Sequence, residues 1–172
     1  IDIVVVTPTY WIDPHFGRLD SPSCSTVHLR FVPLKIWGNG YVSRHVYISP
    51  PLLSLTRRLQ PDIIQVEAEP WSAVYAQMVV LRRLLVPRAK MVCFSWWNTP
   101  DWKTPFYFPG SLAYKISLSA TDLVIAGNRK IMEPCAVSIS DRVIVMMPQL
   151  GVDTEEYRPA PPDPELVSRY AL

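Results

Sequence analysis

The sequence has few cysteines, and they are not arranged in pairs. Cys24, Cys93 and Cys135 are the three cysteines among 172 residues. An odd number with no CxxC spacing argues against a disulfide-stabilised secreted scaffold and favours a reducing compartment. We therefore expect a cytoplasmic protein.

Histidines are equally scarce, and the common glycine signatures are missing. His15, His28 and His45 lie far apart and match no metal-ligand spacing, so structural or solvated roles are favoured. The sequence contains no P-loop, no GxGxxG and no nucleophile elbow. The "GNG" at 38–40 is too short to stand for any of them and predicts only a turn.

Neither strong charge nor a long hydrophobic run is present. Seventeen Lys and Arg against fifteen Asp and Glu give a net charge of +2, too weak for a nucleic-acid footprint, and no apolar run reaches the roughly 20 residues of a membrane span. The pairs Arg57–Arg58 and Arg82–Arg83 fall at the expected ends of two helices, where the macrodipole favours them. Such pairs also suit contact with an anionic membrane surface, so peripheral membrane association is a second expectation.

What the sequence has is a regular alternation of apolar strands and amphipathic helices. With 49% hydrophobic and 19% charged residues, it suffices for one globular domain. Alternation implies parallel strands joined by right-handed crossovers, so we predict a Rossmann-like, doubly wound, mostly parallel α/β sheet. The first strand is a continuous apolar run of the kind that is buried on both faces. Predicted strands are 1–7, 27–37, 62–66, 89–94, 122–126 and 142–147; predicted helices are 50–59, 72–85, 109–120, 129–136 and 164–172; residues 11–25 are predicted to be irregular.

Ligands of such sheets bind beyond the carboxyl ends of the strands. This rule selects three loops, "TYWIDPHFGR", "EAEPWS" and "SWWNTPDW". They carry aromatic rings beside carboxylates and amides, which suit carbohydrate. The tryptophans could equally fill the core, and Glu69 could be a helix-start charge. The candidate sugar-binding residues are Trp71, Trp96, Trp97 and Trp102.

The last part of the sequence, "MMPQLGVDTEEYRPAPPDPELVSRYAL", reads as a strand, a turn, a proline-rich linker and a helix start. Gly151 is suited to the positive φ of a sharp exit from the strand. Asp153 and Glu156 have the spacing of a capping box. Asp163 precedes Pro164 as an N-cap.

Three motifs resemble glycosyltransferase family 4 and its relatives. "PQLGVDTEEYRP" resembles the interdomain segment P-N-G-V-D-x-x-x-F-x-P, "ATDLVIAGN" resembles a strand written A-D-x-V-I-A-x-S, and "PDIIQVEAEPWS" resembles P-D-[IV]-[IV]-H-x-E-E-P-[YW]-S. Their order and spacing fit the family over residues 61–159, and the first sixty residues fit loosely. Such enzymes are built from two facing Rossmann-like domains, the GT-B architecture.

The resemblance implies a truncated acceptor-side domain. Residues 1–158 would be a partial N-terminal domain that lacks the family's first strand, loop and helix, and residues 159–172 the linker and the start of a missing C-terminal donor domain. Gly151, Val152 and Asp153 would then lie at the hinge and cleft. We expect this fragment alone to be unable to transfer sugar, and to associate through the edge that the absent strand exposes.

The resemblance further implies a hexosyltransferase in the complete protein, which transfers sugar with retention from a UDP- or GDP-sugar to a glycan, lipid-linked or small-molecule acceptor. No metal is expected to be required, and no cofactor is expected in this chain. The implied catalytic residues are Glu69, which orients the acceptor or a loop, and Asn98, which hydrogen-bonds the donor sugar where many members have histidine. The sequence departs from the interdomain motif by one inserted residue, at Gln149 and Leu150.

Two alternatives stay open. A non-catalytic Rossmann-like carbohydrate-binding module would share the aromatic loops. A nucleotide-sugar modifying enzyme would share the alternation of strands and helices, although its glycine fingerprint and its Tyr-x-x-x-Lys pair are not found in the sequence.

Overall fold

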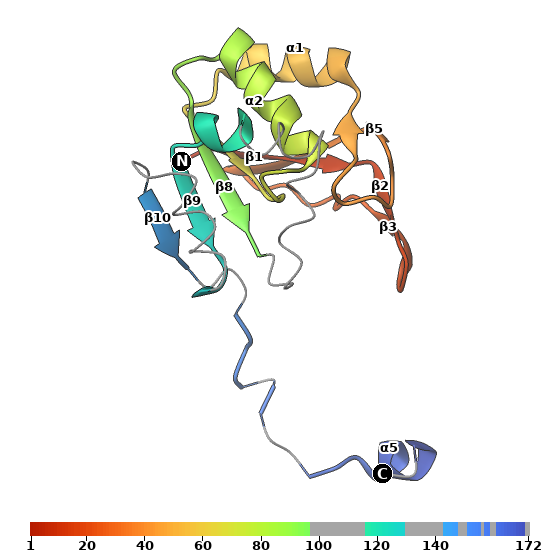
Figure 1. Ribbon diagram of the computed structural model, residues 1–172. Helices are drawn as coiled ribbons and strands as arrows, with labels where there is room; N and C mark the ends of the chain where they lie inside the picture. The colour runs from red at the N-terminus through yellow and green to blue at the C-terminus, as the bar shows by residue number, and fades with distance from the viewer. Residues whose placement is uncertain (97–115, 130–142, 148–150, 156, 159–160, 171–172) are drawn as a thin grey trace.

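The computed structural model describes residues 1–96, 116–129, 143–147, 151–155, 157–158 and 161–170 (Figure 1). Within them the chain is a mixed α/β protein, with a four-stranded parallel sheet and helices packed against it. The strands are β1 (Ile3–Pro8), β2 (Tyr10–Asp13), β3 (Gly17–Asp20), β4 (Leu29–Leu34), β5 (Ile36–Trp37), β6 (Val46–Tyr47), β7 (Ile63–Val66), β8 (Lys90–Ser95), β9 (Leu123–Ala126) and β10 (Val143–Met146); the helices are α1 (Ser49–Leu59), α2 (Ala73–Leu85) and α5 (Pro164–Tyr170).

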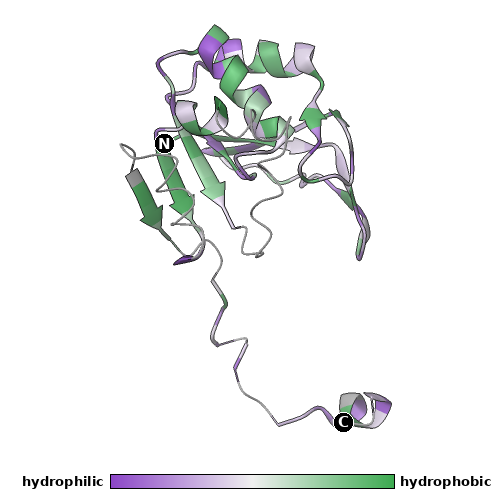
Figure 2. Cartoon of the chain, in the orientation of Figure 1, coloured by the Kyte–Doolittle hydropathy of each residue, from purple (hydrophilic) through white to green (hydrophobic). Residues whose placement is uncertain are grey.

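The main sheet has the order β10-β9-β8-β7, and all its strands are parallel. Its strands are short apolar segments, and β8, β9 and β10 are strongly hydrophobic in Figure 2. Residues 116–120 form a helical segment before β9. The predicted alternation is confirmed here, apart from the residues of predicted helices 109–120 and 129–136 that lie outside the described ranges.

A second sheet consists of β1 and β4, which pair in parallel. The prediction of one continuous sheet is therefore wrong for the described strands, because the β1–β4 pair and the β7–β10 sheet share no ladder. β4 ends at Leu34 rather than at Trp37. The Ile3 N–H donates to the His28 carbonyl, and the Thr9 N–H donates to the Leu34 carbonyl. In this register the backbone nitrogens of odd-numbered β4 residues point away from β1. Pro33 therefore fits inside β4, because the β1–β4 ladder needs no N–H at that position.

β1 was expected to be buried on both faces, and this is also wrong. Ile3 is 51% exposed, and the other residues of the strand are only partly buried. β4 is the single partner of β1 among the described strands. A strand in a two-stranded sheet keeps one edge open, so its apolar side chains find less cover than in a wide sheet.

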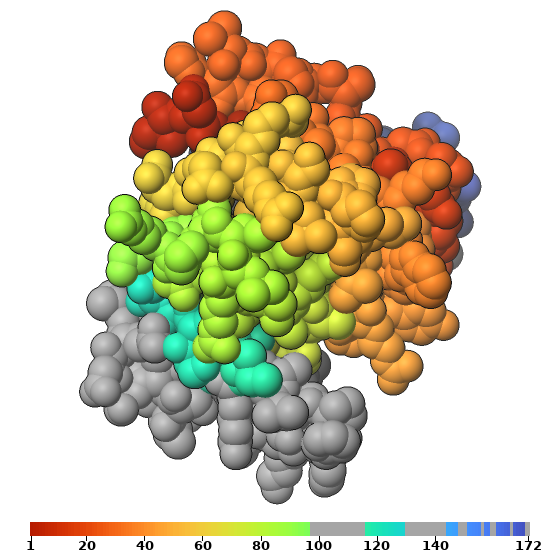
Figure 3. Space-filling model, turned by 90° about the horizontal axis from the view of Figure 1, so that it is seen from above, coloured from red at the N-terminus to blue at the C-terminus, as the bar shows by residue number. Residues whose placement is uncertain are grey.

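α1 and α2 lie side by side on one face of the molecule (Figures 1 and 3). Ser72 caps α2 as predicted, since its hydroxyl accepts from the Tyr75 N–H at 3.3 Å. The two arginine pairs occupy the last turns of α1 and α2. Arg82 is engaged within the protein, because its Nε donates to the Ala89 carbonyl at 2.7 Å.

The core lies between α2, the 116–120 helix and the main sheet. Tyr75 and Val79 of α2 are fully buried, and the Tyr75 hydroxyl lies 2.7 Å from the Thr121 hydroxyl. Burial raises the pKa of Tyr75 far above its ordinary value. The cluster also contains Ile64, Val66, Val86, Ala89, Met91, Cys93, Leu118, Ala120, Val124 and Ala126.

Residues 11–25, predicted to be irregular, contain a β-hairpin instead. β2 and β3 pair antiparallel across a turn at Asp13–Gly17. The Asp13 carboxylate accepts from the N–H groups of His15 and Phe16, and Gly17 has φ +72°. We missed the hairpin because proline and polar residues inside the turn interrupt the alternation that marks strands.

After β10, the described parts of the chain run away from the sheet toward α5 (Figure 1). Gly151 does not take a positive φ, contrary to prediction. Asp153 accepts from the Glu155 N–H at 2.9 Å, while the Glu156 half of the expected capping box lies outside the described residues. Asp163 accepts from the Glu165 N–H at 2.8 Å and begins α5 as predicted.

In the part of the chain that the structure covers, no helix combines the length and the hydropathy needed to cross a membrane.

Candidate functional site

Glu69 lies just after the carboxyl end of β7 and is fixed by the end of β8. One carboxylate oxygen accepts a hydrogen bond from the Ser95 hydroxyl, and the other accepts from the Trp96 N–H at 3.0 Å. Ser95 is almost completely buried. Charge-assisted donors of this kind hold a carboxylate in one orientation. The carboxyl ends of two neighbouring strands thus position Glu69, as the rule for parallel sheets predicts.

A cavity of about 350 Å³ lies beside this carboxylate. Its lining combines the turn 40–43 with Glu69, Trp71 and Ser72 from the β7–α2 connection. Trp71 is partly buried and packs against the hydrophobic core, so it serves the core and the cavity wall together. Trp71 thus packs against the core, as one interpretation expects, while its predicted role in sugar binding stays a prediction.

The other part of the cavity lining comes from a segment distant in the sequence. Gly38 and Gly40 have φ of +75° and +84°, which only glycine adopts readily, and they make the predicted turn. Asn39 binds this turn to β2, because its side chain accepts from the Ile12 N–H at 2.8 Å and donates to the Tyr10 carbonyl at 2.9 Å.

Further contacts hold the same segment against α2. The Ala73 N–H donates to the Ser43 carbonyl at 2.9 Å. Gln77 accepts from the Tyr47 N–H and donates to the Tyr47 carbonyl, at 2.9 and 2.7 Å. The Tyr47 hydroxyl donates to the Val6 carbonyl, and burial raises its pKa to about 12. Tyr47 therefore stays neutral at physiological pH and acts as a structural link.

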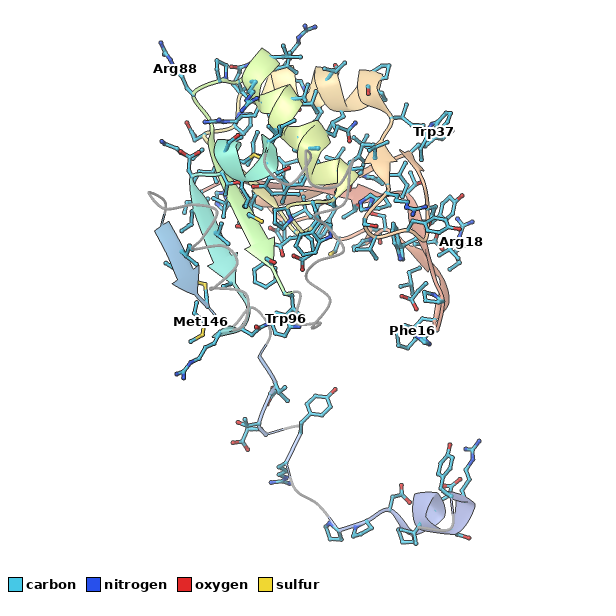
Figure 4. All side chains as sticks on the ribbon, viewed as in Figure 1. Phe16, Arg18, Trp37, Arg88, Trp96 and Met146 are labelled. Carbon is cyan, nitrogen blue, oxygen red and sulfur yellow. The ribbon has the colours of Figure 1, made fainter. Side chains whose placement is uncertain are left out.

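Trp96 follows β8 at the same edge of the sheet and is 44% exposed (Figure 4). Its ring packs on Gly127, which follows β9, and stacks near Phe94 with the centroids 6.1 Å apart. Its carbonyl accepts from the Asn128 side chain at 3.3 Å. The structure thus brings Trp96 and Glu69 together, as the sequence predicts for neighbouring loops.

The other predicted site residues are not gathered there. Asn98, Trp97 and Trp102 lie outside the described residues. Gly151, Val152 and Asp153 are exposed, in the segment that runs away from the sheet. These three residues are not among the described residues that line the Glu69 cavity, and their predicted place at a hinge and cleft stays a prediction.

The first of the three candidate loops has a different place. Its residues form the β2–β3 hairpin, whose tip carries Phe16, 78% exposed and well apart from Trp96 in Figure 4. On this hairpin the Arg18 guanidinium lies 4.4 Å above the Tyr10 ring. The hairpin contacts the turn that lines the cavity through Asn39 and through Ile12, whose carbonyl oxygen would lie 3.3 Å from a Cβ added at Gly40.

Sequence reasoning missed two groups of residues. Gly127 and Asn128 follow β9, so the rule that selected the other loops would also have found them. The lining turn 40–43 carries no comparable signal, because only the packing of distant segments places it beside Glu69.

A larger cavity, of about 420 Å³, lies at the amino ends of β7 and β8, whereas Glu69 lies at the carboxyl ends. It is lined by residues 60–62 and 86–89, before β7 and β8, and Arg88 projects on that side in Figure 4. We place the candidate site at Glu69 because parallel sheets bind ligands at their carboxyl ends.

The arrangement at Glu69 can bind a hydroxyl-rich ligand. Carboxylate oxygens accept hydrogen bonds from hydroxyls, and each oxygen can accept more than one; the neighbouring tryptophans supply apolar surface. The described residues contain no group of three metal-ligating side chains. Comparison of the chain with protein-family models and with curated proteins gave no match.

Proposed function

We propose that this chain provides the acceptor-side domain of a retaining glycosyltransferase of the family 4 type, one Rossmann-like half of a GT-B architecture. The donor, a UDP- or GDP-sugar, would bind mainly to a second domain. The three sequence motifs support the proposal, and so does the position of one of them in the structure: "EAEPWS" supplies Glu69, Trp71 and Ser72 to a cavity at the carboxyl edge of the sheet.

The observation that carries the proposal is the fixed orientation of the Glu69 carboxylate. The Ser95 hydroxyl and the Trp96 N–H each donate to one of its oxygens, and Glu69 lines the cavity. In the proposed reaction, Glu69 accepts a hydrogen bond from an acceptor hydroxyl and so orients it. Orientation of a reacting group is among the largest contributions that an enzyme makes to rate.

Asn98 has a role in the proposal through the resemblance alone. It would donate to a hydroxyl of the transferred sugar, at the position where many family members have histidine. The leaving diphosphate would be stabilised by basic side chains and a helix N-terminus of the second domain.

The first experiment is to sequence the coding region on both sides of this chain. The proposal expects a strand with a glycine-bearing loop upstream, and downstream a nucleotide-binding domain with the E-x(7)-E carboxylates. A stop codon shortly after Leu172 would overturn the catalytic assignment.

The second experiment measures nucleotide release from a panel of UDP- and GDP-sugars by the encoded protein. Glu69→Gln removes the charge with little change of shape, and we expect turnover to fall by more than about tenfold. Glu67→Gln is the matched control, since Glu67 is an exposed carboxylate bonded to Gln65 two residues earlier. Equal turnover in the two variants would remove Glu69 from the site.

One observation favours a second candidate, a non-catalytic carbohydrate-binding module. The cavity and Trp96 lie in the same domain, so glycan binding there needs no donor domain. Glycan binding by this chain without nucleotide-sugar turnover by the encoded protein would support the module and overturn the transferase.

A further inference from the structure

Trp96 is held from several directions although nearly half of it is exposed. Its N–H donates to Glu69, its carbonyl accepts from Asn128, and its ring packs on Gly127. An exposed aromatic ring ordinarily retains rotamer freedom, which is lost on binding. Here two hydrogen bonds fix the backbone of Trp96, and the packing of its ring on Gly127 limits the rotamers of the side chain, as preorganisation of a contact surface requires.

We propose that the exposed part of the Trp96 indole is a subsite for a pyranose ring, and that Gly127 is the positioning residue that creates it. This inference rests on the proposed function, because it assigns the sugar contact within the same site. The C–H face of the pyranose would stack on the indole, while hydroxyls at its rim would reach Glu69 and Asn128.

Gly127 matters because its missing side chain makes room for the ring. A Cβ added to Gly127 would lie less than 3.0 Å from both Cε3 and Cζ3 of Trp96, closer than real Cβ atoms approach. The φ of Gly127 is not in the left-handed region. Alanine therefore suits the backbone at 127, and only the indole excludes it.

The connection between strands keeps this geometry. The Gly127 N–H donates to the Ser95 carbonyl at 2.9 Å, directly before Trp96, and the Ser95 hydroxyl donates to Glu69. Ser95, at the end of β8, is thus bonded both to Gly127 after β9 and to the Glu69 carboxylate. These bonds connect the backbone under the ring to the carboxylate, so both can contact one ligand.

The polar groups favour a sugar over a purely apolar ligand. Glu69 and Asn128 both bond to the backbone of Trp96, so a carboxylate and an amide flank the residue that carries the ring. Carbohydrates pair an apolar C–H face with a rim of hydroxyls, and each hydroxyl both donates and accepts. A carboxylate and an amide beside an aromatic ring suit such a ligand better than a purely apolar one, because both groups can exchange hydrogen bonds with hydroxyls.

The experiment follows the indole N–H of Trp96 in protein labelled with ¹⁵N-tryptophan, assigned from its loss in Trp96→Leu. The probes are the methyl glycosides of glucose, mannose, galactose and N-acetylglucosamine, with uridine as a flat heteroaromatic probe. We expect at least one glycoside to shift this resonance saturably. If no glycoside does so, or if uridine alone does, the subsite is overturned.

Variants then test the role of Gly127. Gly127→Ala and Trp96→Leu are each expected to weaken binding of that glycoside by about three- to tenfold, the worth of one aromatic contact. Trp37→Leu is the matched control, since Trp37 is 72% exposed on β5 and its loss is expected to leave the affinity unchanged. Gly127→Ala protein that melts cooperatively and binds with wild-type affinity would overturn the positioning role.

Failure of this inference differs from failure of the proposed function. If Glu69→Gln abolishes nucleotide-sugar turnover while Trp96 shows no glycoside shift, only the subsite is overturned. If Trp96 binds glycosides and the encoded protein turns over no nucleotide sugar, the subsite stands and the transferase assignment is overturned.

Discussion

Asp122 joins three elements through one carboxylate. One oxygen accepts from the Met91 N–H at 2.9 Å and the other from the Lys90 ammonium at 3.1 Å, with the Arg82 guanidinium 3.6 Å away. Partial burial alone would raise the pKa of Asp122, but these donors and charges outweigh it and hold the pKa below its ordinary value. The ionised form is thus favoured by folding.

Replacing Asp122 by asparagine is expected to destabilise the protein at neutral pH by about 1–2 kcal/mol, since charge-assisted bonds at β8 and α2 are lost. A depressed folded pKa stabilises the protein above the ordinary aspartate value, and this stabilisation disappears as the pH falls through the folded pKa. The difference between wild type and Asp122→Asn should therefore shrink below about pH 4. Urea denaturation at a series of pH values measures it.

Asp62→Asn is the control for this experiment, since Asp62 is exposed and makes no side-chain hydrogen bond in the described part of the chain. A difference for Asp122→Asn that stays constant with pH would contradict the role assigned to its charge.

At the scale of single elements, α2 depends on a cap that is also part of the cavity. Ser72 accepts from the Tyr75 N–H and is almost completely buried. Ser72→Ala should lower the free energy of unfolding by about 1 kcal/mol, because a helix N–H loses its acceptor. Chemical denaturation of the variant measures this, as a lower midpoint at an unchanged slope.

The comparison variant is Ser49→Ala at the start of α1. The N-cap of α1 is Ile48, which makes no side-chain cap bond, and Ser49 is exposed. Equal destabilisation by the two substitutions would mean that the Ser72 hydroxyl does not act as a cap.

At the scale of the whole molecule, the division into two sheets matters because, within the described residues, it leaves strands with one edge unpaired. Among the described strands, β1 pairs only with β4, and β7 pairs only with β8 in the main sheet. Ile3 and Ile63 on these strands are 51% and 62% exposed. Open parallel edges with apolar side chains promote association.

The chain is therefore expected to self-associate with rising concentration, as sedimentation velocity would show. Ile63→Lys should reduce the association, because a charge on an edge strand opposes pairing. Val80→Lys, a similar change at an exposed position of α2, should not. A monodisperse monomer at every concentration would contradict the expectation.

Most elements were predictable because their signals are local. The caps at Ser72 and Asp163, the apolar run of β7 and the helical spacing in α1 each depend on a few consecutive residues. The β2–β3 hairpin escaped prediction because turn residues occupy its middle. The exposure of β1 was not predicted, because an apolar run indicates only that burial would be favourable. It does not indicate which helices or strands would cover the side chains.

At the candidate site, too, the features that depend on local sequence were predictable, and the contacts between distant segments were not. The order of strands and helices, and the place of Glu69 directly after a strand, follow from the sequence alone, because hydrophobic periodicity and strand direction bring loop residues to one edge. That Glu69 lies beside the turn 40–43, and that the Trp96 ring rests on Gly127, was decided only by the tertiary structure. The physical reason is sequence separation: about thirty residues lie between the members of each pair, and no local preference specifies such contacts until helices and strands pack around one core.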